Sequence, residues 1–504
     1  MTASATPSAA AASTRTRGAD TELPAAPRRR FLAQALAGAG LLTLGLPPAL
    51  AATTGTAGGD ANAGVLVGNI TGLYSVLAAH SEAPTSTAAV ADALRRWPGQ
   101  VAVGGGRYSM GGQVAITGGL HLDLRGLNQL VWLRAADKQV RVQAGMRWRD
   151  LQDLLDAQNL AVKTMQSYAN FSIGGAVSVN AHGRYVGHGP VGHTVRALQL
   201  VLADGRVVEA SRSSEPALFA AAIGGYGAVG VITEVELDVT DNQRMERLIQ
   251  PVPLADYPAW FNQQVLADEH SVMHNADLAP PNFDAPVAVT WRRSDKPLTQ
   301  PARLVPRHGR YPLEHGALWA LTELPGAASL RKHVIEPLLV NKPEVAWLNH
   351  EASLDVAKLE PRSRRITTWV LQEYFVPQRH FLPFAQGLGA CLRRHRVEAL
   401  NVSIRHSPAD SVSLLPWAKE AVFSFVLYHR QRTDAKARAA VGAWTRELIE
   451  LALAHDGRYY LPYQLHASRA QFERAYPEVV ALRRLKSSVD PGGKFSNELW
   501  AKYL

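Results

Sequence analysis

The sequence predicts an α+β fold divided between two domains, and three observations support this. A chain of 504 residues is longer than one hydrophobic core usually organises. Apolar residues make up 47% and charged residues 19%, which is a globular composition able to bury a large core. Short strand-like runs alternate with helical stretches up to about residue 239, and longer segments with dispersed prolines and tryptophans follow. We therefore expect a second domain to begin near residue 243.

The first 51 residues differ from the rest and are expected to be a signal peptide. Three arginines at 28–30 precede Phe31 and Leu32, and an apolar Gly/Ala/Leu-rich run then ends in an Ala-x-Ala cleavage site at Ala51. This pattern is typical of twin-arginine export, and the apolar run is too short for a stable membrane span. We expect a bacterial periplasmic protein that meets the twin-arginine export machinery. Because that route carries folded proteins, it also favours a redox cofactor inserted before export.

Charge and cysteine content narrow the function classes. The net charge of +10 is spread over scattered arginine pairs, without a basic block or interleaved aromatic residues, so no nucleic-acid partner is expected. Cys391 is the only cysteine, which excludes an internal disulfide, a cysteine-ligated zinc and an iron–sulfur cluster. His182, His188 and His193 have no carboxylate nearby in the sequence, and no metal site is predicted.

The first domain follows a linker and N-terminal segment at 52–77 and is expected to span 78–242. Apolar residues at helical spacing predict its helices, and short apolar runs between turn residues predict its strands. Asp204-Gly205 lies between two such runs and predicts a hairpin. In chain order, the expected elements are a helix at 88–97, a strand at 101–103, short strands from 120 to 144, a helix at 148–159, the hairpin at 196–210, a helix at 215–223 and a strand at 231–239.

The second domain is expected to span 243–457 and to face a substrate. The tail at 458–504 contains its own strand and helix, and we expect it to return to the first domain. In the second domain, strands are expected at 367–375, 400–404 and 421–428, and helices at 381–396 and 434–454.

Three glycine-rich segments, at 104–112, 174–183 and 224–230, stand at expected strand ends of the first domain. Bare backbone of this kind exposes peptide N–H groups that bind anions. Independent surface turns are the alternative, but three such segments in one domain favour one extended ligand with a diphosphate, and FAD is such a ligand. The Gly225-x-Gly227-x-x-Gly230 spacing matches a dinucleotide fingerprint, but a helix precedes it and a strand follows, so a Rossmann NAD site is not expected.

Five segments in consistent order resemble the FAD-linked oxidase superfamily that includes vanillyl-alcohol oxidase and p-cresol methylhydroxylase. They are VAVGGGRYSMGGQ, the LDL…GLNQL strand pair, VQAGMRWRDLQDLL, SIGGAVSVNAHGR and GGYGAVGVITEVEL. The resemblance implies a two-lobed FAD-binding domain of the vanillyl-alcohol oxidase type, followed by an α+β substrate (cap) domain.

The resemblance also implies which residues bind FAD. The backbone of 104–109 is expected at the pyrophosphate, 172–175 and 180–183 along the ribityl chain and isoalloxazine ring, and the third segment near the adenosine half. Many members bind the flavin covalently through a histidine that aligns at or next to Tyr108, so non-covalent FAD is expected here. The implied residues are Gly104, Gly105, Gly106, Arg107, Tyr108, Ser109, Gln113, Ser172, Ile173, Gly174, Gly175, Asn180, His182, Gly183, Gly227, Gly230, Ile232 and Asn497.

Within the superfamily, the second glycine-rich segment looks most like the sugar-lactone and alditol oxidases and decaprenylphosphoryl-ribose oxidase. The chain departs from these relatives at two places: Ser403-Ile404-Arg405 stands where alditol oxidases carry Glu-x-Arg, and 461–466 (LPYQLH) replaces their His-Trp-Gly-Lys or Ala-Lys. The resemblance implies an FAD-dependent oxidoreductase that oxidises a CH–OH group of a small-molecule sugar, aldonolactone or polyol. Oxygen or a respiratory acceptor is expected to take the electrons.

Five residues are catalytic candidates. Arg405 can stabilise an oxyanion or reduced flavin, Glu373 can contact the substrate, and His182 follows a polar stretch interpreted as a strand beside the flavin ring. Tyr463 and His466 compete as proton acceptor, and an alternating strand would put them on opposite faces. Tyr463 is slightly favoured as the proton acceptor because it stands at the position where the relatives carry a lysine or a histidine.

Two other functions stay open. The YLPY motif at 460–463 resembles the YLPH of cytokinin dehydrogenases, which favours an amine substrate. The absence of the relatives' glutamate and lysine is compatible with a non-catalytic exported flavin-binding protein.

Overall fold

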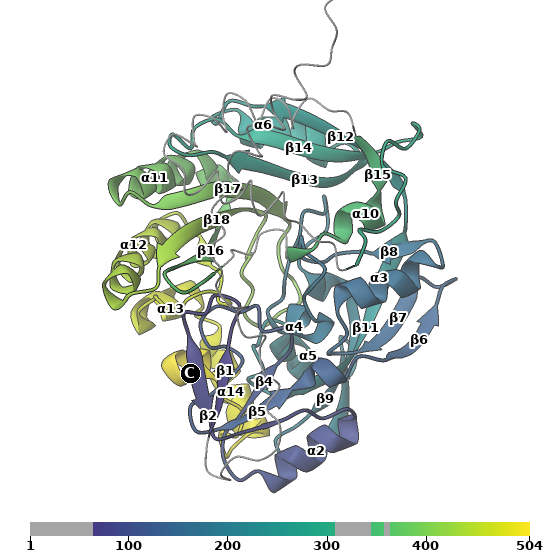
Figure 1. Cartoon of the computed structure of the whole chain (residues 1–504), viewed down its shortest axis with the longest axis vertical. Coiled ribbons are helices and arrows are strands. Elements are labelled where there is room, and N and C mark those ends of the chain that lie inside the picture. The colour runs from purple at the N-terminus through teal and green to yellow at the C-terminus, as the bar shows by residue number, and fades with distance from the viewer. Residues whose placement is uncertain (1–63, 308–343, 357–362) are drawn as a thin grey trace, which may run out of the picture. The chain divides into compact units, whose positions relative to one another are not determined.

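Three β-sheets and the helices packed on them position the functional residues (Figure 1). The computed structural model describes residues 64–307, 344–356 and 363–504. The expected signal peptide at 1–51 lies outside the described residues. Residues 61–504 form one compact unit, so the expected domain boundaries at 242 and 457 remain predictions. In the part of the chain that is described, no helix has the length and apolar character needed to cross a membrane.

The first sheet is parallel and delivers the first glycine-rich segment. Its strands lie in the order β3-β5-β4. Helix α2 begins after Ser86, whose hydroxyl accepts a hydrogen bond from the backbone N–H of Ala89 (3.1 Å), and its apolar face packs on the strands. The glycine-rich segment starts where β4 ends. The bounds are β3 (His80–Glu82), α2 (Thr87–Arg96), β4 (Val101–Gly104) and β5 (Leu120–Asp123), beside a hairpin of β1 (Val65–Gly68) and β2 (Ser75–Ala78).

The second sheet is antiparallel, with the order β10-β9-β11-β7-β6 and with β8 paired to β11. The expected hairpin is confirmed, because β9 pairs with β10 across Gly205, which has a φ of 82°. The bounds are β6 (Leu130–Arg134), β7 (Gln139–Gln143), α3 (Trp148–Asp156), β8 (Leu160–Val162), α4 (Ile173–Ser178), β9 (Val195–Val201), β10 (Val207–Ser211), α5 (Pro216–Ala222) and β11 (Val231–Asp241).

The polar stretch before His182 is a helix, so its interpretation as a strand was wrong. Ile173, Ala176 and Val177 are buried, and their spacing of three and four residues puts them on one face of α4. Gly174 lies against Ala144, where a Cβ would overlap the neighbouring main chain. The second glycine-rich segment therefore presents a helix N-terminus instead of a strand end.

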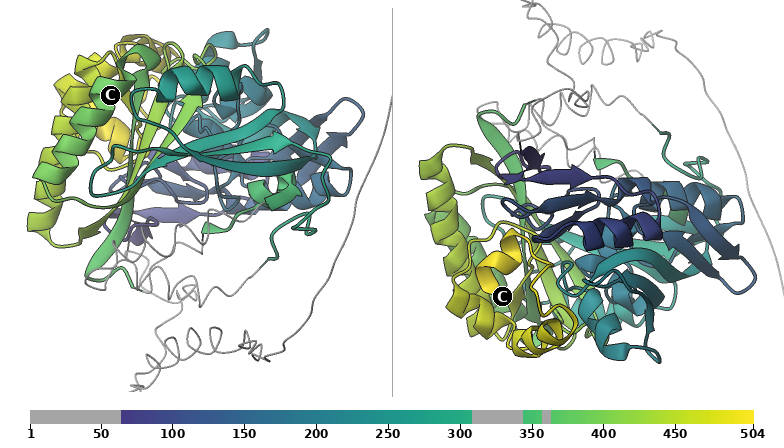
Figure 2. Two further views of the ribbon diagram at one scale, coloured as in Figure 1. Left: turned by 90° about the horizontal axis from the view of Figure 1, so that it is seen from above. Right: turned by 90° about the horizontal axis from the view of Figure 1, so that it is seen from below.

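The third sheet has eight strands in the order β15-β12-β14-β13-β17-β18-β16-β19, all antiparallel. Helices α11 and α12 run along one face of it (Figure 2), where Phe381 and Phe384 pack on Phe423 and Phe425. The bounds are β12 (Arg244–Pro251), α6 (Tyr257–Phe261), β13 (Ser271–Leu278), β14 (Val287–Arg293), β15 (Glu344–Trp347), α10 (Leu348–Ala352), β16 (Thr367–Pro377), α11 (Phe381–Arg394), β17 (Glu398–Ser407), β18 (Val422–Arg432), α12 (Ala435–Ala454) and β19 (Arg458–Tyr459).

The C-terminal segment packs beside the first sheet. Helices α13 (Arg469–Ala475), α14 (Val479–Val489) and α15 (Glu498–Tyr503) follow β19. Phe495 forms a parallel bridge with Val101, and the backbone N–H of Val101 donates to the carbonyl of Lys494 (2.7 Å). The segment therefore adds backbone hydrogen bonds to the strand that carries the first glycine-rich segment.

Candidate active site

All three glycine-rich segments contribute to the wall of one pocket. The pocket also receives Ala144 from the end of β7 and Tyr226 from the turn after α5. Sequence reasoning did not single out either residue, although Tyr226 stands inside the third segment. Of the residues implied to bind FAD, those that line this pocket are Gly105, Ser109, Gln113, Ser172, Gly174, Gly175, Gly227, Gly230 and Ile232.

The backbone of the first segment approaches the start of α4 closely. A Cβ at Gly105 would overlap the hydroxyl oxygen of Ser172, and the backbone N–H of Gly106 donates to that same oxygen (3.2 Å). Any side chain larger than hydrogen at Gly105 therefore displaces Ser172 or the segment. Gly105 and the start of α4 thus form a narrow cradle in the wall of the pocket.

We expect Gly105→Ala to lower the FAD content of the purified protein by at least tenfold, because the added methyl group opens the contact with Ser172. Flavin absorbance per mole of protein measures this. Gly492→Ala is the matched control, since a Cβ there meets no atom within 4 Å. Equal FAD content in the two variants would contradict the assignment of the cradle.

The remaining residues implied to bind FAD do not line this pocket: Gly104, Gly106, Arg107, Tyr108, Ile173, Asn180, His182, Gly183 and Asn497. The Arg107 guanidinium donates to Asp123 (2.9 Å) and lies 3.0 Å from Nε2 of His121. Burial and Arg107 lower the pKa of His121 to about 4, so the imidazole is neutral at neutral pH. Tyr108 packs its ring on Phe171, with the ring centroids 4.5 Å apart.

Several of these polar side chains position the segments. Asn180 donates to Asp410 (2.9 Å) and accepts from the backbone of Gly192 (3.0 Å). The Asn497 side chain caps α15 and donates to the carbonyl of Tyr226 (2.8 Å), tying the tail to the third segment. Gln113, which lines the pocket, donates to the carbonyls of Leu461 and Tyr463 (2.8 Å each). These amides fix the chain that surrounds the pocket.

Four of the five catalytic candidates lie together in a cluster of buried and partly buried side chains. Nε2 of His182 lies 2.5 Å from Oε1 of Glu373, and the Tyr463 hydroxyl donates to Oε2 of Glu373 (3.1 Å). Only 3% of Glu373 and 6% of His182 is exposed. Arg405 interacts electrostatically with the same carboxylate. We call His182, Glu373, Arg405 and Tyr463 the carboxylate cluster.

The register of the eight-stranded sheet explains why these residues meet. Glu373 on β16 and Ser403 on β17 both pair with Val426 of β18, and Arg405 pairs with Ser424. Because side chains alternate along a strand, all of these residues share one face of the sheet. The opposite face carries the phenylalanines that pack under α11 and α12.

The carboxylate cluster is electrostatically asymmetric. Burial acts to raise the pKa of Glu373, but His182, Arg405 and Tyr463 together hold it below its ordinary value, so the carboxyl group is ionised at neutral pH. Burial and the Glu373 charge raise the pKa of Tyr463 well above its ordinary value. Tyr463 therefore stays protonated and acts as a hydrogen-bond donor.

Arg405 has unmet hydrogen-bonding capacity. Its Nε is buried without a hydrogen-bond partner among the described residues, while the residue as a whole is partly exposed. Burial lowers its pKa, while the Glu373 charge acts in the opposite direction. Leaving a buried donor unpaired is unfavourable, so a ligand oxygen or a charged group is the expected partner.

His466 is not brought to the carboxylate cluster. Residues 461–463 form a turn, so the expectation of an alternating strand was wrong. Pro462 cannot donate to a strand ladder, and its carbonyl instead accepts from the backbone of Met110 (2.7 Å). His466 lies against Gly442 of α12, and burial lowers its pKa to about 4.

Two residues that the sequence analysis missed lie beside Arg405. Asp277 on β13 pairs with Ser403 and accepts from the Asn401 amide (2.9 Å), and burial raises its pKa. Arg184 forms an ion pair with Glu351 (2.8 Å) and interacts electrostatically with both Asp277 and Arg405. Asp277 carried a weak signal, a lone carboxylate inside a strand-like run, and Arg184 follows His182 by two positions.

Comparisons with known proteins identify an FAD-binding region and relatives that match most of the chain. A family described as FAD binding domain matches residues 78–211. L-gulonolactone oxidase of Bos taurus is 25% identical over 423 residues, covering 82% of this chain and 92% of the relative. Alditol oxidase of a Streptomyces species is 26% identical over 435 residues, covering 85% and 96%. Decaprenylphosphoryl-beta-D-ribose oxidase of Mycolicibacterium smegmatis is 24% identical over 428 residues, covering 80% and 88%.

Proposed function

We propose that this chain, an FAD-dependent oxidoreductase of the FAD-linked oxidase superfamily, oxidises a CH–OH group of a sugar, aldonolactone or polyol. The observation that carries the proposal is the partly exposed Arg405, whose buried Nε has no hydrogen-bond partner among the described residues and whose charge interacts with the ionised Glu373. The relatives support a sugar-derived alcohol, since they include a lactone oxidase and an alditol oxidase that match most of this chain.

The residues of the glycine-rich pocket fit FAD. The Gly105 backbone would hold the pyrophosphate, the start of α4 would lie along the ribityl chain, and the third segment would contact the adenosine half. When bound, FAD supplies the acceptor for a hydride from the substrate carbon.

The carboxylate cluster would handle the substrate hydroxyl. Arg405 holds the oxygen and stabilises the negative charge that develops on it, and the Glu373–His182 pair accepts the hydroxyl proton. Tyr463 donates to Glu373 and keeps this carboxylate oriented. In this assignment Tyr463 is a positioning residue, because burial and the Glu373 charge raise its pKa and keep its hydroxyl protonated.

Anaerobic visible spectra of the purified holoenzyme test this function. Bleaching of the flavin by L-gulonolactone or by an alditol, but not by amines, is the expected result. Bleaching by amines alone would replace the proposal with amine oxidation of the cytokinin type. A flavin that nothing reduces would indicate an exported flavin-binding protein without turnover.

The FAD is proposed to be non-covalent, because Tyr108 stands at or next to the position of the relatives' flavin-linked histidine. We expect acid precipitation to release all yellow colour into the supernatant. The colour of the washed pellet measures the covalent fraction, and a pellet that stays yellow after unfolding contradicts this prediction.

We also propose export of the folded holoenzyme to the periplasm by the twin-arginine machinery, followed by electron transfer to oxygen or a respiratory acceptor. The motif at 28–32 supports the route. Replacing Arg29 and Arg30 by lysine is expected to retain the protein in the cytoplasmic fraction. Oxygen consumption during turnover distinguishes the two classes of acceptor.

A further inference from the structure

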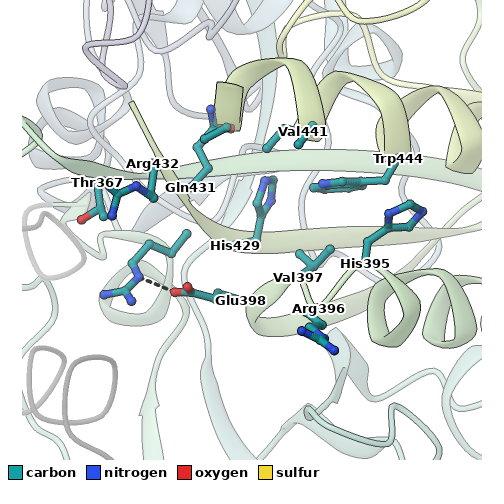
Figure 3. A pocket seen from close by; sticks show the side chains of 13 residues that line it. Thr367, His395, Arg396, Val397, Glu398, His429, Gln431, Arg432, Val441 and Trp444 are labelled. Atoms are coloured by element: carbon teal, nitrogen blue, oxygen red, sulfur yellow. Dashed lines mark hydrogen bonds and ion pairs between the residues drawn. The ribbon is translucent and has the colours of Figure 1, made fainter. Parts of the chain in front are cut away.

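A cavity of about 180 Å³ lies on the helix-covered side of the eight-stranded sheet (Figure 3). Its walls come from β18, from the first residue of β16 (Thr367), from residues 395–398 at the start of β17, and from one face of α12. Ser424 and Val426 of β18 face the carboxylate cluster, whereas His429 belongs to the opposite set of alternating residues. The cavity is therefore separated from the carboxylate cluster by the sheet.

His429 lines this cavity with both ring nitrogens unsatisfied. The side chain is 1% exposed, and neither nitrogen has a hydrogen-bond partner within the described part of the chain. Burial lowers its pKa to about 3, so the ring is neutral and offers one donor and one acceptor. A buried imidazole with two free nitrogens is unfavourable unless something else occupies the cavity.

Gln431, two residues further along β18, offers a free donor to the same cavity. The Tyr74 hydroxyl donates to Oε1 of Gln464 (3.0 Å), and Nε2 of Gln464 donates to Oε1 of Gln431 (2.9 Å). In this arrangement the oxygen of each amide accepts a hydrogen bond. Nε2 of Gln431 is left buried without an acceptor.

The rest of the cavity combines a flat apolar wall with a cationic rim. Trp444 meets the His429 ring edge-on, with the centroids 5.0 Å apart, and Val441 extends the wall (Figure 3). Arg396 and Arg432 are exposed at the rim. Arg432 already pairs with Asp434 (3.1 Å). The Glu398 carboxylate also lines the cavity and pairs with Arg430 (2.6 Å), which leaves Arg396 as the rim cation that the proposal uses.

We propose that this cavity binds a small carboxylic acid with a flat apolar body, at a site distinct from the flavin and its substrate. The carboxylate accepts from the Gln431 amide and the His429 N–H and meets the Arg396 charge, while the body packs on Trp444 and Val441. The size is suitable, since apolar cavities of about 150 Å³ admit a benzene-sized molecule. Benzoate is accordingly a fitting probe.

Calorimetric titration of the holoenzyme with benzoate tests the site. We expect one benzoate per chain, at least tenfold weaker binding in Ala440→Trp, which fills the opening from an exposed helix position, and about fivefold weaker binding in Arg396→Ala. Arg206→Ala is the matched control, because this arginine is exposed on the β9–β10 hairpin and should leave binding unchanged. Benzyl alcohol, which lacks the carboxylate, should bind more weakly than benzoate.

Three results would overturn the proposal. The first is the absence of stoichiometric binding, which would mean that the cavity holds water only. The second is equal affinity of Ala440→Trp and the unaltered protein. The third is competition between benzoate and an alcohol that reduces the flavin, which would put benzoate at the active site. The first two results do not depend on which alcohol the enzyme oxidises.

Discussion

Arg405→Ala is expected to lower kcat/KM for the oxidised alcohol by about 10² to 10³ while the protein keeps its FAD. The physical reason is the position of the guanidinium, which has a buried, unpaired Nε and interacts electrostatically with the Glu373 charge. No other residue of the carboxylate cluster carries a permanent positive charge. Removing it leaves the developing charge on the substrate oxygen unsupported. Steady-state kinetics with an alcohol that bleaches the flavin measures this effect.

A purely structural role for Arg405 would instead appear as a loss of stability, which we do not expect. Because the buried Nε has no hydrogen-bond partner among the described residues, removal of the guanidinium also abolishes a desolvation penalty, and the melting temperature should change little. Arg405→Lys should restore part of the activity, since it returns the charge without the fork of donors. A large loss of melting temperature with unchanged kcat/KM in the folded fraction would refute the catalytic assignment.

Glu373→Gln is expected to lower kcat by about 10² to 10⁴ and to destabilise the fold by about 3 kcal/mol. The substitution removes the charge that His182 and Tyr463 contact in a site that is only 3% exposed. Tyr463→Phe is the matched comparison, because it deletes one hydrogen bond and leaves the ionised carboxylate, at about 1 kcal/mol. Chemical denaturation and turnover measured on both variants separate the two contributions.

Glu373→Gln is also expected to change how the stability of the protein depends on pH. The folded-state pKa of Glu373 lies below its ordinary value of 4.5, so its ionised form stabilises the native protein fully above that value. This stabilisation is lost as the pH falls from about 4.5 through the lower folded-state pKa. Glu373→Gln should therefore be less stable than the unaltered protein at neutral pH, and the difference should shrink in acid. A difference that grows in acid would contradict the assigned charge state.

Much of the fold could be predicted because it rests on local patterns. The apolar spacing at 88–97 and 434–454 predicts two helices that the structure contains as α2 and α12. The runs at 231–239, 367–375 and 421–428 predict the strands β11, β16 and β18. The prediction for the segment before His182 was wrong because two glycines interrupt the apolar face of a short helix. The packing of this helix against Ala144 is seen only in the structure.

The sequence by itself determined that the chain offers three glycine-rich backbones to one extended ligand, and it narrowed the catalytic residues to five candidates. Only the tertiary structure decided which of these meet. His182 and Glu373 are 191 positions apart in the sequence. They meet because the loop that follows α4 brings His182 to the face of the eight-stranded sheet on which Glu373 and Ser403 both lie. Tyr463 joins them and His466 does not, because Pro462 turns the chain there. Contacts of this kind depend on strand register and on the path of the loops, and no local spacing of residues encodes either.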